Sequence, residues 1–151
     1  MLFEPPVLLD AARASSFEPL ARDLSRLVNE GQRGAAAERF LAEVVQVPPP
    51  ALAGLRRSPA WPGLEALAHT LSYDVSLTAR GAQYLELARS VTVPTLVLAG
   101  SASPPWMRDA LGTLAGSLVN GRVHTLEGQT HDVEPATLAR AIAEFLVKSN
   151  N

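Results

Sequence analysis

The chain has 151 residues, a net charge of −2 and no cysteine. Apolar residues make up 47% of it, which excludes a disordered chain, and the length suits one domain of ordinary size. The weakly acidic balance gives no electrostatic basis for binding nucleic acid or an anionic membrane. The absence of cysteine excludes disulfides, a thiolate nucleophile and cysteine-ligated zinc. With no apolar run of about 18 residues and no basic N-terminal region, neither a transmembrane helix nor a signal peptide is expected, and we expect a cytoplasmic protein.

Residues 1–9 predict the end of a strand followed by a turn. Leu2 and Phe3 are apolar, and Glu4 is followed by Pro5 and Pro6. Proline cannot donate to a sheet ladder, so the strand is expected to stop there.

Residues 10–90 predict a helical region that is rich in alanine. Apolar side chains recur in it at the spacing of amphipathic helices, and prolines separate these stretches. The predicted helices cover residues 17–29, 34–47, 51–57 and 61–73, with a shorter one near Leu87.

The pattern changes in residues 91–151, which predict strands alternating with helices. Residues 93–99 read VPTLVLA, an almost continuous apolar run that is typical of a parallel strand covered on both faces. A helix is predicted over residues 106–118, a strand over 122–126 and a final helix over 135–146. This alternation indicates a parallel sheet, in which the loops that follow the strands share one edge. The turn at Glu4 lies at the same edge if the first strand joins this sheet.

His131 and Glu4 are the strongest candidates for chemistry. His131 lies on a short loop between a strand and a helix, where an imidazole can act as a general base near neutral pH; the alternative is an ordinary surface histidine. Glu4 is held between a strand end and two prolines, and a carboxylate there can accept the Nδ1 proton of a histidine. The alternative for Glu4 is a solvated carboxylate. Asp74 is a further candidate for the acid.

Several other polar and aromatic residues are expected to have structural roles. Asp132 is expected to cap the final helix, and Ser103, which precedes a proline, is expected to cap the helix over residues 106–118. Trp61 and Trp106 are expected to pack or to line a pocket. The sequence contains no motif for a phosphate, dinucleotide or zinc site, so neither a cofactor nor a metal is expected.

The succession VPTLVLAG, helix, RVHTLEGQTH and a closing helix with EFL resembles the C-terminal end of α/β-hydrolase-fold enzymes. The resemblance implies a partial α/β-hydrolase fold, in which residues 10–90 are a helical cap and residues 91–151 form a βαβα unit of a parallel sheet. His131 matches the catalytic histidine. The usual acid position of the family is Ser103 here, which is a departure. Glu4 matches the position that some members, including certain haloalkane dehalogenases, use for the acid.

The family's nucleophile elbow, G-x-S-x-G, does not occur in the sequence. The resemblance therefore implies a truncated, esterase-like hydrolase that is inactive alone, with Trp61, Trp106 and Met107 lining the substrate pocket. The alternative is a non-catalytic remnant that acts as a protein- or ligand-binding module. A small-molecule substrate is expected if the fold is completed. A small sheet with open apolar edges also predicts a homodimer or a complementing chain.

Overall fold

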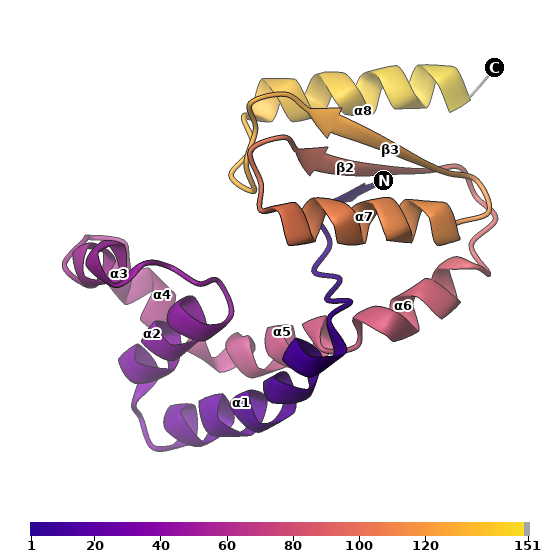
Figure 1. Cartoon of the computed structure of the whole chain (residues 1–151). Helices are drawn as coiled ribbons and strands as arrows, with labels where there is room; N and C mark the ends of the chain where they lie inside the picture. The colour runs from indigo at the N-terminus through magenta and orange to yellow at the C-terminus, as the bar shows by residue number, and fades with distance from the viewer. Residues whose placement is uncertain (150–151) are drawn as a thin grey trace. The chain divides into compact units, whose positions relative to one another are not determined.

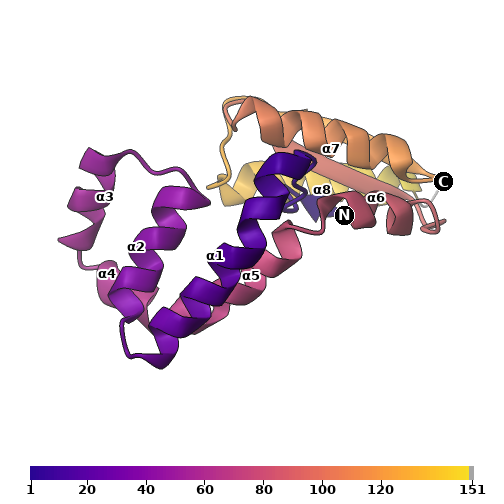
Figure 2. The ribbon, with the colours of Figure 1, turned by 60° about the horizontal axis from the view of Figure 1, so that its bottom comes forward.

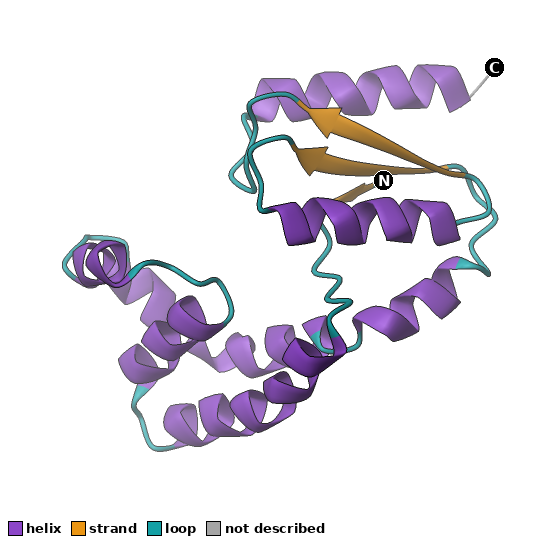
Figure 3. Cartoon of the chain, in the orientation of Figure 1, coloured by secondary structure: helices purple, strands orange, loops and turns teal. Residues whose placement is uncertain are grey.

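The computed structural model describes residues 1–149 and divides into two compact units, which are described separately. One unit joins residues 1–9 to residues 80–149, and the other comprises Asp10–Ala79. In the described part of the chain, all strands belong to the first unit and the second is made of helices alone (Figure 3).

The sheet unit is built on parallel strands in the order β1–β2–β3. These strands are β1 (Leu2–Phe3), β2 (Thr95–Gly100) and β3 (Gly121–Leu126). Phe3 pairs with Leu98 in the register between β1 and β2. The N-terminal strand therefore joins the same sheet, which the sequence analysis had left open, and the three strand exits lie at one edge.

Helices cover both faces of this sheet. The strands lie between α7 (Pro105–Ser117) and α8 (Pro135–Ser149) (Figures 1 and 2). Val97 and Ala99 pack with residues of α7, whereas Leu96 and Leu98 pack on the other face with Ala141 of α8. Every residue of β2 is buried for this reason, which explains its continuous apolar sequence.

The helix α6 (Gly81–Ala88) packs against α7 and belongs to the sheet unit. The second segment of this unit therefore begins at Arg80, whereas the sequence analysis placed all of residues 10–90 in the helical region. Gly81 lies directly against the backbone of Leu8, and a Cβ at this glycine would overlap the Leu8 carbonyl. The two segments of the sheet unit therefore meet at Leu8 and Gly81.

The helical unit is organised by α1, which lies beside α5 in both views (Figures 1 and 2). Phe17, Leu20, Leu24 and Leu27 are buried along α1 at helical spacing. The helices are α1 (Ala11–Asn29), α2 (Arg33–Glu43), α3 (Pro49–Arg56), α4 (Trp61–Leu67), the 3₁₀ helix η1 (Ala68–Thr70) and α5 (Leu71–Thr78).

Two helix boundaries in this unit differ from the predicted ones. Helix α1 begins at Ala11, before the predicted start at residue 17, because the Asp10 side chain accepts a hydrogen bond from the Arg13 amide at 3.0 Å. The single helix predicted over residues 61–73 is interrupted by η1. None of the helices within residues 1–149 has both the length and the apolar character that crossing a bilayer requires.

Candidate active site

The sheet edge brings Glu4 and His131 together. Glu4 directly follows β1, and His131 lies on the loop between β3 and α8. Nδ1 of His131 lies 2.9 Å from Oε2 of Glu4; the carboxylate side chain is 0% exposed, whereas the imidazole is 71% exposed. A carboxylate only accepts hydrogen bonds, so Nδ1 carries the proton of this bond. The structure therefore pairs the two residues that the sequence analysis paired.

Both carboxylate oxygens of Glu4 have hydrogen-bond donors. Oε1 accepts the backbone N–H of Gly100 at 2.8 Å, and Oε2 accepts from His131. The backbone N–H of Glu4 donates to the Leu98 carbonyl at 3.0 Å. Burying a carboxylate is costly unless it is hydrogen-bonded, and these donors provide that compensation.

The loop after β2 is hydrogen-bonded to the loop between β3 and α8 that carries His131, here called the histidine loop. The Ser101 amide donates to the Leu126 carbonyl at 2.9 Å, and the Ala102 amide donates to the Gln129 carbonyl at 3.0 Å. Oγ of Ser101 accepts the Gly128 amide at 2.8 Å. Gly100 is required beside these bonds because a Cβ there would overlap the carbonyl oxygen of Gln129. One loop therefore positions both the acid and the histidine loop.

Comparison with solved structures finds the crystal structure of an α/β hydrolase from Sphaerobacter thermophilus that is 38% identical to this chain, with a TM-score of 0.75. The match covers 95% of this chain. The chain belongs to the α/β-hydrolase-fold family. It spans 56% of the length of that structure. The predicted fold class, a partial α/β-hydrolase fold, is confirmed. No family model matches this α/β-hydrolase chain, and comparison with curated proteins finds no match.

Ser103 does not cap a helix in this α/β-hydrolase chain. Helix α7 is preceded by Pro104 and has no side-chain cap. The Ser103 hydroxyl is buried and has no hydrogen-bond partner within residues 1–149. The capping prediction was wrong because Pro104 already presets the first turn, and Ser103 turns into the interior instead.

Glu134, and not Asp132, caps the final helix of the α/β-hydrolase chain. Its carboxylate accepts the amide of Ala136 at 2.9 Å and that of Thr137 at 2.6 Å. These hydrogen bonds lower the pKa of Glu134 from its ordinary value of 4.5. The bond from Ala136 has the largest effect, followed by those from Thr137. Asp132 is exposed. The prediction for Asp132 was wrong because Glu134, the residue directly before the helix start at Pro135, accepts the free amides of the first turn.

Replacing Glu134 with glutamine tests this cap through its pH dependence. The pKa of Glu134 is lowered in the folded chain, so its charge stabilises the fold above the ordinary value of 4.5, and this stabilisation is lost as the pH falls through the folded-state pKa. We expect the variant to melt below the wild type at about pH 7 and the difference to shrink as the pH falls below 4.5. Thermal denaturation across this range measures it. A difference in Tm that does not vary with pH would contradict the assignment.

The candidate pocket residues lie in different surroundings. Trp61 is 9% exposed in a cluster with Ala37 and Leu52 in the helical unit, and its Nε1–H donates to Glu65 at 2.8 Å. Trp106 and Met107 are half-buried in the first turn of α7. Their substrate-binding roles stay predictions, and Trp61 has the surroundings of a core residue. Asp74, the other candidate acid, is exposed on α5 of the helical unit.

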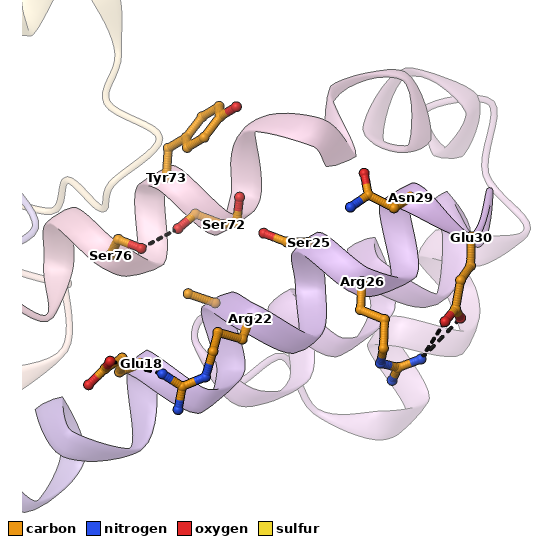
Figure 4. A pocket seen from close by; sticks show the side chains of 10 residues that line it. Glu18, Arg22, Ser25, Arg26, Asn29, Glu30, Ser72, Tyr73 and Ser76 are labelled. Carbon is orange, nitrogen blue, oxygen red and sulfur yellow. Dashed lines mark hydrogen bonds and ion pairs between the residues drawn. The ribbon is translucent and has the colours of Figure 1, made fainter.

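The helical unit also contains an open groove that the sequence analysis missed. It has a volume of about 670 Å³ and lies between α1 and α5 (Figure 4). Arg22 and Arg26 line it; Arg22 is ion-paired with Glu18 of α1, and Arg26 is ion-paired with Glu30, the residue that follows α1. The other lining residues are Glu18, Ala21, Ser25, Asn29, Glu30, Ser72, Tyr73 and Ser76. These side chains include neither Glu4 nor His131. No group of three potential metal ligands occurs within residues 1–149.

Proposed function

We propose that this chain carries the acid–base part of a hydrolase active site that acts on an ester or a related bond. The observation that carries the proposal is the 2.9 Å contact between a fully buried carboxylate and an exposed imidazole. A buried charge is expensive to maintain for packing alone, and a histidine that is exposed at a strand exit is accessible to a substrate. His131 is the general base in this proposal, and Glu4 orients it.

The proton transfers follow from the hydrogen bonds of the ring. Glu4 occupies Nδ1 of His131, which leaves Nε2 as the nitrogen that takes a proton from an attacking hydroxyl. The same nitrogen then returns this proton to the leaving group. The buried carboxylate stabilises the imidazolium that exists between the two transfers.

The nucleophile is proposed to lie outside these 151 residues, because the sequence has no G-x-S-x-G motif. The matched structure is longer, since this chain covers 56% of it. A segment of the same polypeptide or a complementing chain would supply the nucleophile and the oxyanion donors. Within residues 1–149 no strand pairs with the free side of β1, where Leu2 is 38% exposed, and that edge is suited to such a segment.

The test supplies the missing part of the fold. The region of the Sphaerobacter protein that this chain does not match is fused to the 151-residue chain, and hydrolysis of p-nitrophenyl butyrate is measured. We expect hydrolysis by the fusion and none above background by the chain alone. His131→Ala is expected to lower the turnover of the fusion by about 10³-fold or more, because the general base is lost.

His124→Ala is the matched control, because His124 is an exposed histidine of β3 that has no proposed role. Full activity of the His131→Ala fusion would contradict the proposal. A folded fusion that neither reacts with a serine-directed fluorophosphonate nor hydrolyses an ester would favour the binding-module alternative. Esterase-like turnover by the chain alone would show that the nucleophile lies within it.

A further inference from the structure

Two consecutive residues at the N-terminus contact the imidazole of His131. One is the Glu4 carboxylate, at 2.9 Å from Nδ1. The other is the ring of Phe3, whose centroid lies 6.0 Å from that of the imidazole with 18° between the planes. A single hydrogen bond at Nδ1 leaves the ring free to tilt about that bond. A stacked aromatic ring restricts this tilt, because stacking fixes the plane of its partner.

Phe3 and Glu4 are consecutive in the sequence, yet both contact the same imidazole. In a regular strand, consecutive side chains point to opposite faces of the sheet. Phe3 is paired with Leu98 and packs with it on the face covered by α8. Glu4 leaves the strand conformation with a φ of +38°, which is uncommon for a residue with a side chain. The alternation is interrupted at this residue, so the carboxylate reaches His131 beside the Phe3 ring.

The Phe3 ring is itself held in place. It is half-buried against a cluster of Leu96, Leu98, Leu126 and Ala141. This cluster joins β2 and β3 to α8, and the histidine loop lies between β3 and α8. A ring that is anchored in this way can fix the orientation of an imidazole that is otherwise 71% exposed.

We propose that Phe3 is a positioning residue for His131, and that the left-handed backbone at Glu4 exists to bring both side chains onto one imidazole. Glu4 fixes the direction of Nδ1, and Phe3 fixes the plane of the ring. Together they give Nε2 one direction before a substrate binds. The kinetic consequence of this inference rests on the proposed hydrolase function, whereas the order of the ring does not.

The first experiment uses the 151-residue chain and its three histidines. The histidine rings are labelled with ¹³C, and ring relaxation and the Hε1 shift of His131 are compared in the wild type, Phe3→Leu and Phe3→Tyr. We expect Phe3→Leu to remove the ring-current shift and to increase ring motion at His131, with His69 and His124 unchanged. Phe3→Tyr keeps an aromatic ring and should restore both signals. Unchanged His131 signals in Phe3→Leu would overturn the proposal.

A second variant separates positioning from simple loss of stability. Leu138→Ala removes a partly buried side chain from the same cluster. It should lower Tm as Phe3→Leu does and leave the His131 signals unchanged. An equal change at His131 in Leu138→Ala would overturn the proposal. In the hydrolytic fusion, Phe3→Leu should lower kcat roughly tenfold with little change in KM, because a mispositioned base slows proton transfer without weakening substrate binding. An inactive fusion with the expected relaxation changes would contradict the hydrolase function and leave the positioning role supported.

Discussion

If the proposed function holds, replacing Glu4 with glutamine in the fusion with the Sphaerobacter segment is expected to lower turnover by about 10³–10⁴-fold. Glutamine has the shape of glutamate, and its carbonyl oxygen can still accept the Gly100 amide. Its amide group donates hydrogen bonds, so it cannot accept the Nδ1 proton of His131. The histidine then favours the tautomer that is protonated on Nε2, and this tautomer cannot take a proton from a nucleophile. The fold should be retained while the base is lost.

The tautomer is measured directly on the 151-residue chain with long-range ¹H–¹⁵N correlation spectra. We expect His131 to carry its proton on Nδ1 in the wild type and on Nε2 in Glu4→Gln. Glu127→Gln is the matched control, because it makes the same chemical change at an exposed residue of the histidine loop. Turnover within a few-fold of the wild type in Glu4→Gln would refute the role of Glu4, even if the tautomer changed.

Replacing Gly100 with alanine is expected to destabilise the sheet unit by about 2–4 kcal/mol. The added Cβ would overlap the carbonyl oxygen of Gln129, a backbone group that is held by the Ala102 amide. A flexible side chain could move away, but this carbonyl cannot move without displacing the histidine loop. The amide of Gly100 also donates to Glu4, so the same shift would disturb the buried carboxylate. Thermal denaturation should show a Tm lowered by roughly 5–10 °C.

Gly112→Ala is the control for this substitution. Gly112 lies within α7, and a Cβ there would meet no atom within 4 Å. Alanine is favoured over glycine inside a helix, so this variant should be more stable by about 0.5–1 kcal/mol. Similar Tm values for the two variants would show that the close approach of Gln129 to Gly100 does not limit the stability of the fold.

Most of the fold was predictable because it depends on patterns that are local in the sequence. The apolar run in residues 93–99 indicated a strand buried on both faces, and β2 lies between α7 and α8 as that pattern requires. The helical spacing in α1 follows the same principle. The two strand exits that carry Glu4 and His131 were expected to lie at one edge only if the first strand joined the sheet, because parallel strands end at the same edge.

The parts that were not predicted depend on geometry between distant segments. Glu134, and not Asp132, is the cap, and its backbone amide is held by the side chain of Gln129 on the preceding loop. Glu4 has a φ of +38°, and its side chain contacts Gly100 and His131, which lie far along the chain. The stacking of Phe3 on His131 depends on that backbone and leaves no periodic signal in the sequence.

The meeting of Leu8 and Gly81 has a consequence for how such proteins diversify. Because the entry and exit of the intervening residues 10–79 are neighbours on the sheet unit, a replacement of different length or shape can be spliced between them without stretching the backbone that leads to Glu4. Evolution or an engineer can therefore exchange residues 10–79 while the contact between Glu4 and His131 keeps its geometry.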